Sequence, residues 1–105
     1  MKLYLDDIRI PRTNGWVVVR SYDEFINHIE KNGLPEEMSL DHDLGEDTPT
    51  GYDCVRWMVY EKQLDLRKTK INIHSANPVG EKNMEKLINN WIKHLNNQDN
   101  NELTI

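Results

Sequence analysis

The sequence predicts an α/β fold with a mainly parallel four-stranded sheet. Short apolar runs of strand character alternate along the chain with segments whose apolar residues recur at helical spacing. Such alternation is typical of parallel strands joined by right-handed crossovers. A second observation is that three strands end on chemically active side chains, in the motifs LYLDDIR, SLDHDLG and INIHSANP. The 105 residues suit one domain, which we place at 1–96, followed by a polar tail at 97–105 that we expect to fray.

Four segments have strand composition. Residues 2–5 form an apolar run before an acidic pair, and residues 16–20 (WVVVR) predict a strand buried on both faces. The third and fourth strands are predicted within 37–44 and 70–76. The segment IRIPRTNG, between the first two strands, is short and interrupted by proline, so it predicts a loop instead of a helix.

Three helices are predicted between and after these strands. Ser21 and Glu24 form a capping-box pattern, which begins a helix that ends near Gly33. Thr50 is placed to cap a second helix over roughly 51–63. The third helix has the most regular apolar stripe, formed by Met84, Leu87, Ile88, Trp91, Ile92 and Leu95.

The composition excludes several classes of function. A net charge of −5 disfavours extended binding to nucleic acid or to anionic lipid, but it permits a small phosphate ligand held by a metal. The single cysteine, Cys54, fits a reducing compartment and predicts packing on a helix instead of thiol catalysis. The sequence contains neither a membrane-spanning apolar run nor a signal-peptide pattern, so we expect a cytoplasmic protein without membrane contact.

The strand ends predict one site assembled from three segments. Ligands of open parallel sheets bind outside the carboxyl ends of the strands, where the loops diverge. A switch in strand order between the first and third strands would bring their acidic ends together. The candidate metal ligands are therefore Asp6, Asp7, Asp41 and Asp43.

Carboxylates this close together require either retained protons or a bound cation. Oxygen-only ligation favours Mg²⁺, or Mn²⁺, which commonly recruits phosphate oxygens as well. A zinc site would need His42 and His74, and the sequence lacks the close spacing of histidines or cysteines that such a site requires.

Several other residues have ordinary structural explanations. Asp53 is predicted to be a first-turn helix acid. Trp16, Trp57 and Trp91 are predicted to pack in the core or between helices, although Tyr52 or Trp57 could instead stack on a nucleobase.

These motifs resemble a known family. The acidic pair after the first strand, Asp43 after the third (with Asp41 as competitor), Gly51 and the Ser-Ala pair after the fourth resemble the receiver domain of two-component signalling. More narrowly, LYLDDIR, SLDHDLG, TGYD and HSANPVG, in that order, resemble the cyclic-phosphate-processing receiver-like domains. The resemblance covers residues 2 to about 95. It implies a truncated receiver-like (flavodoxin-like) three-layer sandwich, with the first helix replaced by a loop.

The resemblance also implies a function. The expected activity is a Mg-dependent phosphoesterase that processes a small cyclic phosphate of ribose or nucleotide type. The receiver lysine on the fifth strand has no counterpart here, so Arg9, or else Lys82, would supply the positive charge. The catalytic candidates are Asp43, His74 and His42, and the candidate phosphate ligands are Ser75, Asn77 and Arg9.

Two other functions remain open from sequence. The chain could be a non-catalytic module that binds a cyclic nucleotide or a protein, or it could accept a phosphoryl group on Asp41 or Asp43. A sheet that ends at the fourth strand has open edges, and these make a homodimer possible.

Overall fold

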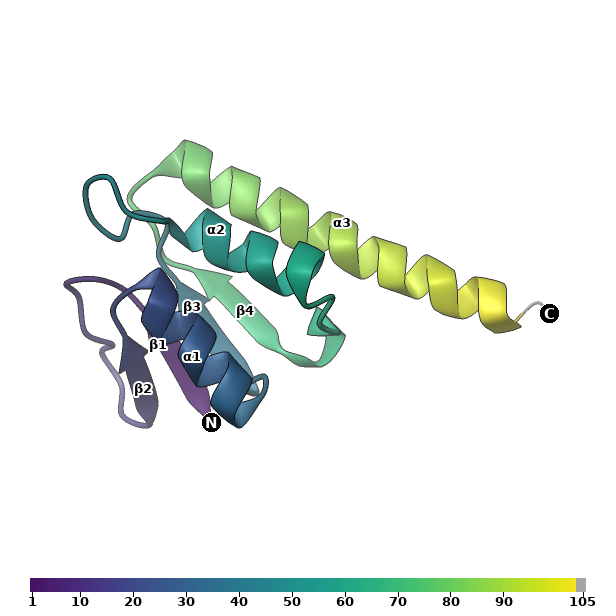
Figure 1. The fold of residues 1–105 in the computed structure, drawn as a ribbon, viewed down its shortest axis with the longest axis horizontal. Helices are drawn as coiled ribbons and strands as arrows, with labels where there is room; N and C mark the ends of the chain where they lie inside the picture. The colour runs from purple at the N-terminus through teal and green to yellow at the C-terminus, as the bar shows by residue number, and fades with distance from the viewer. Residues whose placement is uncertain (104–105) are drawn as a thin grey trace.

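The computed structural model describes residues 1–103, with side chains described for residues 1–99. Four parallel strands form one sheet in the order β2-β1-β3-β4 (Figure 1). The strands are β1 (Lys2–Leu5), β2 (Trp16–Val19), β3 (Glu37–Leu40) and β4 (Lys70–Ile73). The predicted fold class is thus confirmed: the sheet is parallel, and residues 6–15 contain no helix between β1 and β2.

The helices begin at the caps that the sequence predicts. In α1 (Tyr22–Asn32), the Ser21 hydroxyl accepts the Glu24 amide at 3.2 Å, whereas the Glu24 carboxylate accepts the amide of Arg20. In α2 (Gly51–Arg56), Thr50 and Asp53 form a complete capping box. The helix then continues as a π-helical turn, η1 (Trp57–Glu61), and a short 3₁₀ turn, η2 (Leu66–Lys68), leads into β4.

The last helix, α3, runs from Pro78 to Leu103 and is about 39 Å long at 1.5 Å per residue. Pro78 suits the first helical position because its missing N–H would have no intrahelical partner there. Residues 97–103, which we assigned to a polar tail, continue the helix because they contain no glycine or proline to end it. Figure 1 shows α3 projecting past the sheet towards the C-terminus. Thr104 and Ile105 lie outside the described residues.

One core forms between the helices and one face of the sheet. Side chains that alternate to this face in β1 and β3 are fully buried, as are residues from every α-helix. Cys54 belongs to this core, as predicted, and burial raises the pKa of its thiol. The largest fully buried members are Leu3, Leu5, Phe25, Met38, Leu40, Met58, Leu66 and Met84.

The opposite face of the sheet carries Tyr4, Trp16 and Val18, and none of these side chains belongs to the core. Within residues 1–103 all three α-helices pack on the other face of the sheet. The fold therefore has two layers, one of helices and one of strands, instead of the expected three. The loop that replaces the receiver's first helix accounts for the uncovered face. The prediction that β2 is buried on both faces is wrong: Trp16 lies on the face that no helix covers, and Val17 on the other face is 40% exposed because β2 is an edge strand.

Candidate metal and phosphate site

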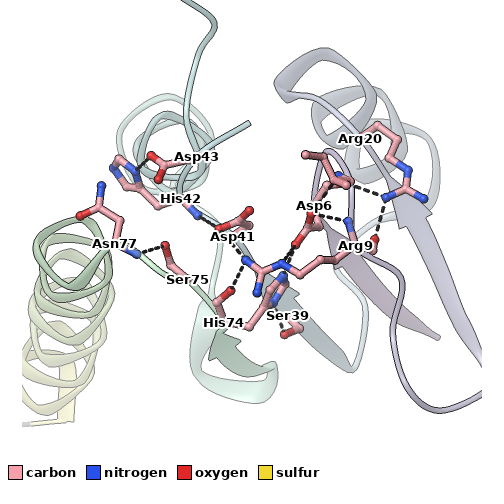
Figure 2. Close-up of polar contacts among 11 residues, drawn as sticks. Asp6, Arg9, Arg20, Ser39, Asp41, His42, Asp43, His74, Ser75 and Asn77 are labelled. Carbon is pink, nitrogen blue, oxygen red and sulfur yellow. Dashed lines mark hydrogen bonds and ion pairs between the residues drawn. The ribbon is translucent and has the colours of Figure 1, made fainter. Parts of the chain in front are cut away.

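Strand register places three polar side chains next to one another. Leu5 pairs with Leu40, and Leu40 pairs with Ile73, so the residues that follow them are Asp6, Asp41 and His74. Pairing continues one step beyond the strands: the Asp41 amide donates to the Leu5 carbonyl at 2.9 Å, and the His74 amide donates to the Leu40 carbonyl at 3.0 Å. The three segments therefore converge, as the strand-end argument predicts (Figure 2).

Asp6 is the most constrained acid of the site. It is 1% exposed, and its Oδ1 accepts the backbone amides of Ile8 and Arg9 at 2.9 and 2.8 Å. Its Oδ2 lies 3.0 Å from Arg9 Nε and 3.0 Å from His74 Nε2. Burial alone would raise the pKa of this carboxyl, but the two amides, His74 and Arg9 together lower it. Asp6 is therefore held ionised, with Oδ1 accepting two amide hydrogen bonds and Oδ2 contacting His74 and the Arg9 guanidinium.

Asp41 has the opposite electrostatic character. It is 4% exposed, and its Oδ1 accepts the His42 amide at 2.8 Å. Burial raises the pKa of this carboxyl, and the negative charge of Asp6 raises it further. Two neighbouring carboxyls thus have pKa values displaced in opposite directions, which is common in catalytic and cation-binding sites.

Arg9 lies between these two acids. Its Nε pairs with Asp6, its Nη2 is 3.6 Å from Asp41 Oδ1, and Nη2 also donates to the His74 carbonyl at 3.3 Å. The guanidinium partly neutralises the acids while remaining half exposed to solvent. Arg9, which we predicted to bind phosphate, therefore lies beside the acidic cluster.

Three carboxylates can approach a single cation. Asp6, Asp7 and Asp41 each offer an oxygen, and these oxygens all lie within 4.8 Å of one another. An oxygen-only donor set fits Mg²⁺ or Mn²⁺, and this cluster of described residues includes no histidine for zinc. Asp6 already accepts two backbone amides, contacts His74 and pairs with the Arg9 guanidinium, so a cation bound to Asp6 would compete with Arg9 for Oδ2.

The acids line a groove of about 520 Å³, which we call the acid groove. Its volume is within the usual range for small-molecule sites. Its walls are Asp6, Asp7, Ile8, Arg9, Asp41, Asp43, Gly45, Glu46 and Ala76.

β3 ends at Leu40, before the end of the range 37–44 that we predicted for it, so Asp41 and Asp43 both follow the strand. The His42 amide donates to the side chain of its neighbour Asp41, and the chain leaves the sheet at this point. The Asp43 side chain is 62% exposed and lies outside the three-carboxylate cluster, although it lines the acid groove. The strand does not stay extended through residue 43, so Asp41 and Asp43 do not present their carboxylates as neighbours on one strand face.

Asp43 forms a pair with His42. His42 Nδ1 is 2.8 Å from Asp43 Oδ1. This hydrogen bond, helped by Asn77 and opposed by slight burial, lowers the pKa of the Asp43 carboxyl. The imidazole packs against the start of α3, where a Cβ atom on Gly80 would come within 2.5 Å of the ring. Figure 2 shows this pair on the α3 side of the site, away from Arg9.

Ser75 and Asn77 shape the beginning of α3. The Ser75 hydroxyl accepts the Asn77 amide at 3.0 Å, and Asn77 Oδ1 accepts the Gly80 amide at 3.0 Å. Asn77 is therefore the N-terminal cap of α3. Both residues follow β4 beside the acid groove, and their predicted contact with phosphate stays a prediction.

His74 is fixed by residues that the sequence did not single out. Its Nδ1 lies 2.6 Å from the hydroxyl of buried Ser39, and its ring stacks on Tyr4 with centroids 4.4 Å apart. Since Nε2 faces ionised Asp6, the pattern assigns the proton to Nε2 and makes Nδ1 the acceptor of the Ser39 hydroxyl. The sequence did contain an indication of this contact, because Ser39 is two residues before Asp41 and therefore lies on the same strand face.

Arg20 is a second residue that sequence reasoning missed. Its Nη1 donates to the Asp6 carbonyl at 3.0 Å and to the Arg9 carbonyl at 2.7 Å, which holds the start of the 6–15 loop. It directly follows β2, whose last residue pairs with Leu5 of β1. The register argument that located the acids would have placed Arg20 beside them.

A four-stranded parallel α/β sheet whose acids gather at the carboxyl ends of the strands defines this chain as a receiver-like domain. Residues 1–90 match the cyclic-phosphate processing receiver domain, and the chain belongs to that family. Comparison with curated proteins and with solved structures gave no match. No helix within the described residues is long and apolar enough to cross a membrane.

Proposed function

We propose that this domain is a metal-dependent phosphoesterase that hydrolyses a small cyclic phosphate. The observation that carries the proposal is the cluster of Asp6, Asp7 and Asp41, whose oxygens lie within 4.8 Å of one another beside His74 and Arg9. The family's description as cyclic-phosphate processing supports the substrate class.

The carboxylates of the cluster would hold Mg²⁺ or Mn²⁺. A bound ion of this kind neutralises phosphate charge and lowers the pKa of a coordinated water. In the structure the Arg9 guanidinium lies between Asp6 and Asp41 and reduces their mutual repulsion, as a bound cation would. Because its guanidinium is half exposed, it is free to turn towards a phosphate, for which its planar donors are suited. Arg9 therefore contributes phosphate binding, and its departure frees an acceptor site on Asp6.

Hydrolysis of a cyclic phosphate needs a proton acceptor for the attacking water and a proton donor for the leaving oxygen. Asp43 suits the first role because it lines the acid groove and is accessible to water there, while its lowered pKa leaves it ionised but a weaker base. His42 orients Asp43 through the 2.8 Å hydrogen bond. His74 is the proposed proton donor; it would act as an imidazolium, with Nδ1 protonated as well, and its Nε2 proton would leave the hydrogen bond to Asp6 to reach the leaving oxygen. One P–O bond of the ring breaks, and the product is a phosphomonoester.

The experiment that tests this proposal measures turnover of adenosine 2′,3′-cyclic phosphate and of a ribose cyclic phosphate without a base. We expect phosphomonoester formation with Mg²⁺, none in EDTA, and none for Asp41→Asn. Asp23→Asn makes the same chemical change on the exposed first turn of α1, and it should keep full activity. Full activity in Asp41→Asn would contradict the proposal.

One observation favours a second candidate, a module that binds a cyclic phosphate without turnover. Asp6 already accepts two backbone amides, contacts His74 and pairs with Arg9, so part of the charge of the acids is compensated without a metal. The same assay separates the two candidates: binding that is unaffected by EDTA and produces no phosphomonoester would favour the module.

A further inference from the structure

A second groove adjoins the acid groove on the uncovered face of the sheet. We call it the aromatic groove, since Tyr4 and Trp16 contribute to its wall. Its volume is about 680 Å³, which is larger than that of the acid groove. The two grooves share Ile8 and Arg9 as lining residues and therefore lie next to each other.

The aromatic wall is rigid. Tyr4 and Trp16 meet edge to face, with centroids 5.9 Å apart and planes at 74°. The Trp16 indole N–H donates to the Thr13 hydroxyl at 2.9 Å, and the Tyr4 ring also stacks on His74. Because these rings are already held in place, the protein would lose little further side-chain entropy when a planar ligand binds to them.

The loop beside this wall exposes apolar side chains. Ile8 is 80% exposed and Ile10 is 72% exposed, and both line the aromatic groove. Arg12 also lines the groove and adds positive charge beside the aromatic rings. Apolar and aromatic walls with a few polar groups are typical of sites for small organic ligands.

We propose that the aromatic groove binds the nucleobase of the same ligand whose cyclic phosphate lies in the acid groove. The substrate class would then be nucleoside cyclic phosphates instead of simple sugar phosphates. This inference rests on the proposed function for the position of the phosphate end. The adjacency of the two grooves at Arg9 supports it, because a base and its phosphate are separated by a single ribose. Stacking on an aromatic wall is tolerant of base identity, because every base presents a π-face.

The test measures binding by calorimetry, in the presence of Mg²⁺, for three probes: adenosine 2′,3′-cyclic phosphate, a base-free methyl riboside 2,3-cyclic phosphate, and adenosine. We expect the nucleotide to bind about tenfold or more tightly than the base-free compound, as is usual for one stacked base. Trp16→Leu should remove most of this preference and leave affinity for the base-free compound unchanged. Tyr60→Ala, at an exposed aromatic residue outside the groove, is the matched control and should change neither affinity.

Ile10→Ala is a second variant, and it should not affect folding because the Ile10 side chain is exposed and outside the core. It should reduce the preference for the nucleotide several-fold. Equal affinity of the wild type for the nucleotide and the base-free compound would overturn the inference while leaving the proposed function intact. Binding of adenosine without binding of the base-free compound would support the aromatic groove and contradict the phosphate site. Pairing of two copies that is abolished by Trp16→Leu, with no adenosine binding, would overturn the inference in favour of a dimer contact.

Discussion

Replacing Asp41 by asparagine should stabilise the metal-free protein at neutral pH. Asp41 is buried beside ionised Asp6, and its pKa is raised. Oxygens of the two carboxylates lie within 4.8 Å, and at this separation the repulsion is about 1 kcal/mol in a water-like dielectric and about 3 kcal/mol at an effective dielectric near 20. Arg9 offsets part of it, so we expect a gain of about 1 kcal/mol, or roughly 4–8 °C in melting temperature.

The pH dependence of this gain has a definite sign. A raised pKa in the folded state means that ionisation of Asp41 costs stability above that pKa and costs nothing below the unfolded value. The gain in Asp41→Asn should therefore be complete at pH 7 and disappear near pH 3. Asp6 has a lowered pKa, so its ionised form adds stability above the unfolded pKa, and this is lost as pH falls through the folded value. Asp6→Asn should accordingly destabilise the protein at pH 7.

The assay is denaturation followed by circular dichroism in EDTA at pH 7 and pH 3, with Asp23→Asn as the exposed control. An Asp41→Asn variant that is less stable than the wild type at pH 7 would refute the reasoning. A gain of equal size at pH 3 would refute it too, since no charge would then be involved.

Two further substitutions test the supports of the histidines. Ser39→Ala leaves Nδ1 of His74 without its buried partner, so we expect a loss of about 1–3 kcal/mol in the free energy of unfolding. The ¹⁵N spectrum of the His74 imidazole should also change. An unchanged spectrum would contradict the assigned tautomer. Gly80→Ala places a Cβ atom within 2.5 Å of the His42 ring, so urea denaturation should reveal a loss of about 1–3 kcal/mol. NMR should also reveal loss of the His42–Asp43 hydrogen bond, and a His42 resonance identical to that of the wild type would count against this packing.

The convergence of the strand ends could be predicted from sequence because it depends on few variables. Parallel strands align their carboxyl ends, and a strand order with the first and third as neighbours brings Asp6 and Asp41 together. The early end of β3 could not be predicted, because it depends on the side chain of Asp41 accepting the His42 amide and on the His42 ring packing against Gly80. The second of these contacts joins distant parts of the chain, and strand propensity does not encode it.

The aromatic groove was missed for a related reason. The run WVVVR has the same composition whether helices cover one face of the sheet or both, so Trp16 was assigned to packing. Only the arrangement of the three helices on one face leaves Tyr4 and Trp16 outside the core.

The central claim is that Asp6, Asp7 and Asp41 form a divalent-cation site. Calorimetric titration with Mg²⁺ and Mn²⁺ at pH 7.5 tests it most directly, on the wild type and on Asp7→Asn, Asp41→Asn and Asp43→Asn. We expect millimolar or tighter binding that is lost in Asp7→Asn and Asp41→Asn and kept in Asp43→Asn, because Asp43 lies outside the cluster. No binding to the wild type, or a loss confined to Asp43→Asn, would contradict the claim.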